Sequence, residues 1–398
     1  LPKEQAAETF VEMEPEAKEL LIRGFSDNEL KEVLDELYVD DAADIVEEMP
    51  ANVVQRILKH ADPAMRSSIN QILRYPEDSA GSIMTTEYVS LRPHMTVEEA
   101  ILRIRRQGVD KETIYTCYVT EKDRTLIGLV TVKDLLLAAD DETKIEDIME
   151  TNLISVTTQT DQEEVAATLS KYNFIALPVV DGENRMVGIV TFDDAMDVIE
   201  EETTEDFEKM AAILPSDKPY LKTGVVETWR SRIPWLMLLM LSATFTGMII
   251  TGFENALAAQ VALTAFIPML MDTGGNAGSQ ASVTVIRGLS LNEIEYRDVP
   301  KVVFKEIRVA LICGITLSAA NFVKLLLLDK VGVLVAASVC LTLVAAVVIA
   351  MIIGCLLPIL AKRLGFDPAV MASPFIPTIV DAMSLLVYFC VASAIFGL

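Results

Sequence analysis

The feature that most constrains the fold is a series of long apolar segments that begins only near residue 231. Each segment is long enough to cross a hydrocarbon core of about 30 Å as a helix. The approximate ranges are 233–253, 256–286, 307–328, 331–361 and 368–397. The sequence therefore predicts an all-α transmembrane domain with five helices over residues 231–398.

The residues before this domain have the composition of an acidic soluble protein. Residues 1–230 hold 49 of the 58 acidic and 23 of the 33 basic side chains, whereas the apolar part is nearly neutral. So acidic a surface argues against nucleic acid as a partner, because phosphate binding requires basic side chains. It favours cations instead. Since the first apolar segment follows this soluble stretch, we expect the amino-terminal half to remain in the cytosol.

Basic residues in the connecting loops predict the orientation of the membrane domain. Nine lie on one side and two on the other: Arg230, Arg232, Arg287, Arg297, Lys301, Lys305, Arg308, Lys362 and Arg363 against Lys324 and Lys330. Because cytoplasmic loops carry the excess of Lys and Arg, the soluble domain should lie in the cytoplasm and the carboxyl terminus outside.

Asp381 lies near the middle of the fifth apolar segment. An ionisable group at membrane depth is costly and by default marks an ion or proton pathway. Pro377, Ser384 and Tyr388 share its helical face and make that face polar. The alternative is that Asp381 is neutral, or is paired with a lysine at a helix end.

The centre of the second apolar segment is also unusual. Gly274, Gly278 and Ser282 form a small-residue face that allows another helix to approach closely. A neighbouring polar face holds Thr273, Asn276, Gln280 and Thr284. Such a face by itself indicates only helix packing, but polar groups at this depth together with Asp381 favour a pathway.

A tandem repeat precedes the membrane domain. Ile83-Met84 is echoed by Ile148-Met149, and Gly128–Thr131 followed by Asp134 is echoed by Gly188–Thr191 followed by Asp194. Strands alternating with helices indicate an α/β fold. The arrangement resembles a pair of cystathionine-β-synthase (CBS) domains, which commonly sense ligands such as adenosine nucleotides. We predict these domains over 81–142 and 143–202, after a helical N-terminal array over 1–80.

Between the repeat and the membrane domain we expect a connecting helix over 203–230. The acidic run leading into it starts at Asp193 and places Asp194, Asp197, Glu201 and Glu205 at helical spacings of three and four. Like charges at this spacing destabilise an isolated helix, so a counter-cation would stabilise it. A solvated acidic face is the simpler interpretation of the same run.

Taken together, the CBS pair, the GGNAGSQ segment and the lone aspartate of the fifth span resemble the MgtE family of bacterial magnesium channels. The resemblance covers essentially the whole chain. It implies a multi-pass protein of the bacterial inner membrane, working as a homodimer among membrane lipids. It also implies a central pore lined by the second and fifth spans, with Asp381 of both subunits at the ion site and Asn276 nearby.

The same resemblance implies a regulatory role for cytosolic Mg²⁺, which closes the channel by bridging acidic faces. The matching positions are Asp161, Glu163, Asp194, Asp197, Glu202, Glu205, Asp206 and Asp367. A nucleotide, ATP or another adenosine nucleotide, is expected at Thr131, Lys133, Asp134 and Phe174. Asn173 stands where some relatives are expected to carry aspartate, which puts a metal site there in doubt.

The resemblance thus implies a non-enzymatic, magnesium-selective channel that imports Mg²⁺ and is closed by intracellular Mg²⁺. One alternative is an intramembrane aspartyl protease using Asp272 and Asp381, since two carboxylates sharing a proton are the required chemistry. Another is a CBS-regulated carrier of other divalent cations. A chloride channel with CBS domains would be expected to have more spans and basic or hydroxyl pore groups.

Overall fold

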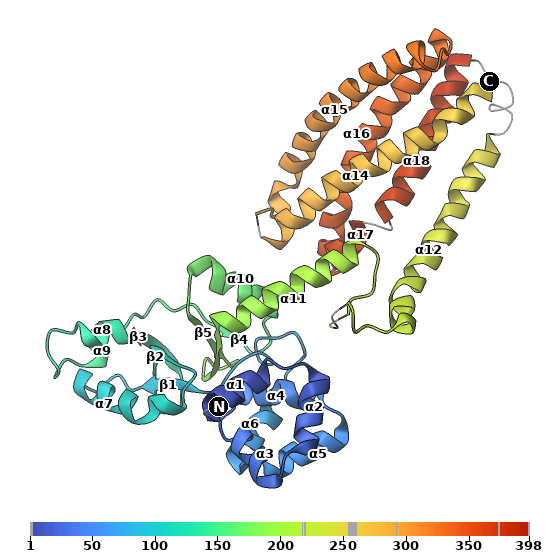
Figure 1. Ribbon diagram of the computed structural model, residues 1–398. Helices are drawn as coiled ribbons and strands as arrows, with labels where there is room; N and C mark the ends of the chain where they lie inside the picture. Colours follow the sequence, from blue (N-terminus) through green and yellow to red (C-terminus); the bar gives the residue numbers. More distant parts are fainter. Residues whose placement is uncertain are drawn as a thin grey trace. The chain divides into compact units, whose positions relative to one another are not determined.

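The computed structural model describes residues 3–216, 218, 220–253, 261–291, 293–372 and 375–396. The chain forms two compact units, Leu1–Glu200 and Glu201–Leu398, and each is described here by itself. Figure 1 shows a helical array and a mixed α/β region in the first unit and a bundle of long helices in the second.

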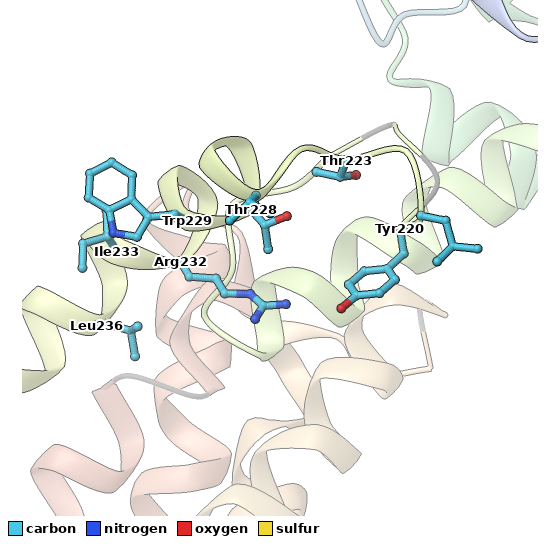
Figure 2. A pocket seen from close by; sticks show the side chains of 9 residues that line it. Tyr220, Thr223, Thr228, Trp229, Arg232, Ile233 and Leu236 are labelled. Atoms are coloured by element: carbon cyan, nitrogen blue, oxygen red, sulfur yellow. The ribbon is translucent and has the colours of Figure 1, made fainter.

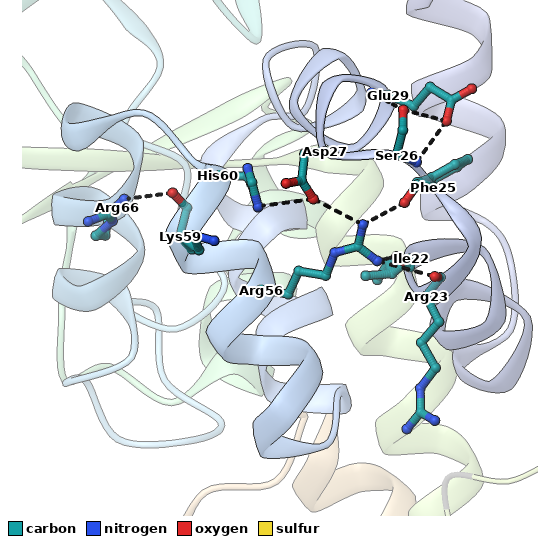
Figure 3. A network of polar contacts seen from close by, with 10 residues as sticks. All are labelled: Ile22, Arg23, Phe25, Ser26, Asp27, Glu29, Arg56, Lys59, His60 and Arg66. Carbon is teal, nitrogen blue, oxygen red and sulfur yellow. Dashed lines mark hydrogen bonds and ion pairs between the residues drawn. The ribbon is translucent and has the colours of Figure 1, made fainter.

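The helical array matches the predicted N-terminal domain. Its helices are α1 (Lys3–Val11), α2 (Pro15–Gly24), α3 (Asp27–Leu34), α4 (Val39–Glu48), α5 (Ala51–His60) and α6 (Pro63–Ile72). Arg56 of α5 caps the carboxyl-terminal end of α2. Its guanidinium donates to the carbonyls of Ile22 (2.6 Å), Arg23 (3.2 Å) and Phe25 (Figure 3). The last carbonyls of a helix have no partner within the helix, so this side chain supplies it.

The α/β region contains two copies of one topology. The first copy has β1 (Tyr88–Leu91), α7 (Val97–Gln107), η1 (Gly108–Asp110), β2 (Thr113–Thr120), β3 (Leu126–Thr131) and α8 (Val132–Leu136). The second has α9 (Ile145–Ile148), β4 (Val156–Thr157), α10 (Gln162–Tyr172), β5 (Ala176–Val180), β6 (Met186–Thr191) and α11 (Phe192–Met210). In each sheet the first pair of strands is parallel and the second antiparallel. The predicted tandem α/β fold is therefore present.

The segment before the first strand of each copy pairs with the last strand of the other copy. Thr85 forms two backbone hydrogen bonds of 2.9 Å with Ile189 of β6, and Glu150 pairs in the same way with Leu129 of β3. A Cβ on Gly188 would lie 2.6 Å from the carbonyl oxygen of Thr85. Gly188 is therefore explained by the crossing of a neighbouring backbone, whereas at Gly128, the equivalent glycine of the first copy, a Cβ would meet the side chain of Met149 at 2.6 Å.

The acidic helix α11 runs without interruption from Phe192 to Met210. The predicted connecting helix, over 203–230, differs from this in extent: its first residues belong to α11, and its last residues begin the first membrane helix. Among the described residues from 211 to 224 the backbone forms turns and extended segments. The helix ends after Met210, and Ala212 adopts a positive φ of 55° that does not continue a right-handed helix.

The second unit is helical. Its elements are α12 (Val225–Gly252), η2 (Val261–Phe266), α14 (Ile267–Ser290), η3 (Tyr296–Asp298), α15 (Val299–Leu327), α16 (Val333–Arg363), α17 (Pro368–Ala372) and α18 (Phe375–Phe396). By length and composition, four helices among the described residues can cross a membrane: α12, α15 with the turn before it, α16 and α18.

The second predicted span needs a correction. The sequence predicts a helix over 256–286, but α14 begins at Ile267 and continues to Ser290. Residues 254–260 lie outside the described part of the chain. Polar residues such as Asp272, Asn276 and Gln280 lower the mean hydropathy of α14, so α14 is not among the four apolar helices.

Glycines bring the helices of the bundle close together, as predicted for Gly278. A Cβ on Gly278 would lie 2.9 Å from the Ile376 side chain of α18 and 3.1 Å from the Ala350 carbonyl of α16. A Cβ on Gly354 of α16 would collide with the Gly278 carbonyl. Figure 1 shows α14, α15, α16 and α18 running side by side. Without side chains at these points the backbones make van der Waals contact, which is the main source of helix association in a membrane.

Candidate functional site

Asp381 is half-buried on α18 and faces the glycine pair of α14. Its Oδ1 atom would lie 4.0 Å from a Cβ placed on Gly275, and Asp272 of α14 is close enough to act on it electrostatically. A bulkier residue than glycine would narrow the space beside the carboxylate. The local sequence Asp272-Thr-Gly-Gly-Asn276 therefore gives this carboxylate an open, acidic flank.

The rest of the predicted polar face is used in packing. Ser384 is 1% exposed and lies 3.0 Å from where a Cβ of Gly274 would be. The Tyr388 hydroxyl donates to the Leu263 carbonyl at 2.9 Å. Asn276 and Asp272 lie one turn apart on α14 and are exposed in the single chain. On this face of α18, Asp381 is thus the polar group that packing leaves available.

A second acidic site lies within the second unit, at the end of α11. The Lys209 ammonium lies 2.5 Å from Glu205 and 2.7 Å from Asp367, and Asp367 also accepts 2.8 Å from the Ala369 amide at the start of α17. Burial, and then the negative charge of Asp367, raise the pKa of Asp206 to about 6. The structure therefore brings together three of the predicted regulatory carboxylates, Glu205, Asp206 and Asp367, around one lysine that the sequence analysis did not include.

The third acidic site belongs to the first unit and was not predicted. Carboxylate oxygens of Asp40 on α4, Glu87 before β1 and Glu112 before β2 all lie within 4.8 Å of one another. Asp40 is 9% exposed, and its Oδ1 atom and the Oε2 atom of Glu112 are buried without a hydrogen-bond partner among the residues that the structure describes. We call these three residues the Asp40 cluster. Its geometry suits a hard cation held by oxygen ligands.

The charges around the Asp40 cluster explain the titration of its members. Burial, followed by the charges of Asp194 and Asp193, raises the pKa of Glu112 to about 8. Burial and then Asp194 raise the pKa of Asp40 well above its usual value. Carboxylates at such close range repel one another, and either protons or a bound cation would relieve the repulsion.

Asp194, one of the predicted regulatory residues, therefore contributes its charge to the Asp40 cluster. It also accepts a hydrogen bond from the Thr191 hydroxyl at the start of α11, which holds its side chain in place. Burial raises its pKa. Burial, and then Glu12, raise the pKa of Asp197 one turn further along α11.

The other predicted residues have local structural roles. Asp161 is the N-cap of α10 and accepts 2.9 Å from the amide of Glu163. Glu202 lies near the middle of α11, and its side chain is half-buried. Asn173 ends α10 in the left-handed conformation, with φ of 53° and ψ of 43°. Asparagine adopts this left-handed conformation more readily than most residues. The end of α10 therefore explains why asparagine occupies position 173, where aspartate was expected in some relatives.

The proposed nucleotide residues divide between the two repeats. Thr131 and Asp134 form a capping box at the start of α8: the Thr131 hydroxyl donates to Asp134 at 2.5 Å, and the Asp134 amide donates back at 3.2 Å. Lys133 lies between them on the same turn. Phe174 stacks on Tyr172 at 5.5 Å between ring centroids. Of these groups, the Thr131 hydroxyl already donates to Asp134 and the Phe174 ring already stacks on Tyr172.

Comparison with known proteins decides the family. A family model described as divalent cation transporter, MgtE, matches residues 267–391, the MgtE intracellular N domain matches 1–78, and CBS domains match 80–141 and 145–201. The chain is 41% identical over 402 residues to the magnesium transporter MgtE of Thermus thermophilus, covering 98% of this chain and 87% of that protein. The chain belongs to the MgtE family of magnesium transporters.

A second relative belongs to the same family. The magnesium transporter MgtE of Bacillus subtilis is 36% identical, with 89% of this chain and 78% of that protein covered. Among solved structures, the cytosolic domain of the Mg²⁺ channel MgtE in complex with ATP is 42% identical, covers 50% of this chain and 81% of that chain, and has a TM-score of 0.48. The family predicted from the sequence is therefore confirmed. MgtE proteins are membrane transporters and not enzymes, so the aspartyl protease alternative is not retained.

Asp40, Glu87, Glu112 and Lys209 were not predicted from the sequence. Asp40 is the first of five acidic residues on α4, together with Asp41, Asp44, Glu47 and Glu48, and this was the available signal. Glu87 and Glu112 each precede a strand and carry no motif of their own. Their role depends on which helix packs over the ends of those strands.

Proposed function

We propose that the chain is a magnesium-selective channel that imports Mg²⁺ and works as a homodimer. The observation that carries the proposal is the half-buried Asp381 on α18, beside Gly275 and Asp272 of α14. Polar groups in the membrane are retained where they serve an ion path. Membership of a magnesium transporter family supplies the identity of the ion.

The chemistry of Mg²⁺ suits this arrangement. Mg²⁺ gives up its water reluctantly and is usually held by one or two carboxylates with several waters retained. Two copies of Asp381 facing each other across a dimer axis would provide two negative charges without surrounding the ion. Asp272 and Asn276, exposed one turn apart on α14, would extend the polar lining. Weak binding of this kind permits release, which conduction requires.

We further propose that cytosolic Mg²⁺ closes the channel by occupying the acidic sites outside the membrane. Support comes from the Asp40 cluster, whose buried Asp40 Oδ1 lacks a partner, and from Asp206 beside Asp367. A bound divalent cation would replace repulsion between these carboxylates with attraction. Asp161, Glu163, Asp194, Asp197, Glu202 and Glu205 remain proposed contributors.

Two further parts of the proposal concern the nucleotide and the orientation. Thr131, Lys133, Asp134 and Phe174 would hold an adenosine nucleotide, with Phe174 stacking on the base and Lys133 near the phosphates. The excess of Lys and Arg in the loops supports a cytoplasmic first unit and an external carboxyl terminus in the bacterial inner membrane.

The decisive experiment measures magnesium entry into liposomes that contain purified full-length protein and a trapped magnesium indicator. Asp381→Asn should abolish entry while the protein still elutes as the parent does on size exclusion. The matched control is Asp329→Asn, which removes a carboxylate paired at 3.1 Å with Lys324 in a loop away from Asp381. Normal entry through the Asp381→Asn protein would overturn the pore assignment. Equal entry of Mn²⁺ or Co²⁺ through the parent would favour a carrier or channel for divalent cations in general.

A further inference from the structure

A cavity of about 470 Å³ lies beside the first turns of α12, where the preceding loop folds against the helix. It is lined by Tyr220, Leu221, Thr223, Val225, Thr228, Trp229, Arg232, Ile233 and Leu236 (Figure 2). The loop is held there at two points: the Leu214 amide donates to the Ser231 carbonyl at 3.0 Å, and Lys218 pairs with Glu227 at 3.0 Å. These two contacts join the loop to α12 and so form the wall of the cavity.

The lining combines apolar side chains with one charge. Leu221 is 94% exposed, Tyr220 77% and Trp229 57%, which is unusual for large apolar groups. Arg232 is the charged lining residue, and no hydrogen bond or ion pair is found for its guanidinium in the described part of the chain. Figure 2 shows Arg232 extending toward Tyr220, while Ile233 and Leu236 continue along the helix away from it.

The position of Arg232 along α12 sets its depth in a membrane. From Ile233 to the end of α12 at Gly252 the helix carries no charged residue. Those 20 residues span about 30 Å at the helical rise, which is the thickness of the hydrocarbon core. Arg232 is thus placed at the level of the lipid phosphates, and Tyr220 and Trp229 at the level where aromatic side chains gather.

We propose that this cavity binds the head group of an anionic phospholipid. The Arg232 guanidinium would hold the phosphate, for which its paired donors are well suited. The Tyr220 hydroxyl would contact the head group, and Ile233 and Leu236 would lie against the first methylene groups of an acyl chain. The inference rests on the proposed membrane placement of α12 and goes beyond the magnesium pathway, since none of these residues belongs to the ion sites.

A lipid fits this cavity better than a second copy of the chain. A protein surface packed over the cavity would bury an unpaired guanidinium, which is strongly unfavourable unless a carboxylate is supplied. An anionic lipid supplies the charge and the apolar chain together. No residue in the apolar stretch of α12 is fully buried within the described part of the chain, so lipid can reach the cavity along the helix.

The test uses the two tryptophans of the chain, Trp229 in the cavity and Trp235 one turn and a half further on. Trp235→Phe leaves Trp229 as the single reporter and keeps an aromatic ring against Phe375. The full-length protein is placed in phosphatidylcholine liposomes that contain equal small fractions of either brominated phosphatidylglycerol or brominated phosphatidylcholine. Quenching of Trp229 then measures which lipid occupies the cavity.

Brominated phosphatidylglycerol should occupy the site about fivefold more than brominated phosphatidylcholine, the ratio that about 1 kcal/mol per basic residue gives at an anionic surface. Arg232→Gln should bring the ratio near one. Arg230→Gln is the matched control, because it removes the same charge two positions away without lining the cavity, and it should keep the ratio.

Three results would overturn the proposal: equal quenching by both lipids in the parent, an equal loss of preference in both arginine variants, or no quenching by either lipid. The second result would indicate a diffuse attraction of basic residues to the membrane, and the third a second copy covering Trp229. Magnesium entry is measured in the same liposomes. Intact entry with no lipid preference would refute this inference alone and leave the proposed channel function standing.

Discussion

Replacing Asp40 with asparagine tests whether the Asp40 cluster is a cation site. Asparagine keeps the size of the side chain and removes one negative charge from three carboxylates whose oxygens lie within 4.8 Å. Two opposite effects are expected. Without divalent cations the variant should be more stable than the parent, and with magnesium the advantage should disappear.

The magnitude follows from the distances. Two unit charges 4.8 Å apart repel by about 0.9 kcal/mol at the dielectric constant of water and about 3.5 kcal/mol at an effective value of 20. Asp40 takes part in two such pairs, with Glu87 and with Glu112. Glu87 and Glu112 are only half-buried, so solvent screens both pairs and we expect relief near the lower end, about 2 kcal/mol. For a unit of this size that corresponds to a rise in Tm of about 4–8 °C.

The assay is thermal unfolding of the purified full-length protein, first with EDTA and then across a magnesium titration, at a pH above the pKa of Glu112. In EDTA the first unit of the Asp40→Asn variant should unfold at a higher temperature than the first unit of the parent. Saturating Mg²⁺ should raise the Tm of the parent more than that of the variant, because the parent offers a more negative site. Asp35→Asn, an exposed residue of the same helical array, is the matched control and should respond to Mg²⁺ as the parent does.

Two outcomes would refute the reasoning. A lower Tm for Asp40→Asn in EDTA would mean that the Asp40 carboxylate is stabilising, for example through a bound proton shared with a neighbour. An equal response of parent and variant to Mg²⁺ would mean that the cation binds elsewhere in the first unit.

Three further predictions concern stability. Arg56→Ala should destabilise the helical array by about 2–3 kcal/mol, since its charged donors reach several carbonyls, and the loss should appear as a lower Tm in the same assay. Gly188→Ala should cost about 1–3 kcal/mol through collision with the Thr85 carbonyl, whereas Gly182→Ala, with open space around it, should leave the Tm unchanged. Glu112→Gln should flatten the pH dependence: the folded-state pKa of about 8 exceeds the ordinary value of 4.5, so metal-free stability should fall as pH rises between these values, and a Tm that rises over that window would contradict the assignment.

Local sequence patterns identified the elements of this protein. Apolar runs predicted α12, α15, α16 and α18, because the length of a membrane span is a property of consecutive residues. The same reasoning misplaced the start of the second span, since the segment before α14 is apolar yet Val261–Phe266 forms a separate 3₁₀ turn. The repeated Gly-x-x-Thr-x-x-Asp pattern predicted the tandem repeat, but not that Gly188 is required by a backbone from the other copy.

The candidate sites divide in the same way. Asp381 could be recognised from sequence because a charge in an apolar helix is costly wherever the helix packs. Ser384 and Tyr388 looked equally polar on the helical face, and only the packing of α14 and η2 showed that both are buried and used in contacts. Lys209 gained its place between Glu205 and Asp367 from the way the chain returns before α17.

By itself the sequence determined a soluble acidic half, an α/β repeat and an apolar helical half with one carboxylate in its last span, because hydrophobicity, charge and helical period are read from neighbouring residues. The tertiary structure decided which carboxylates meet. Asp40, Glu87 and Glu112 lie far apart in the chain and come together only because α4 packs over the starts of two strands. Electrostatic repulsion depends on distance in space, so the acidic composition could predict an affinity for cations but not the place where they would bind.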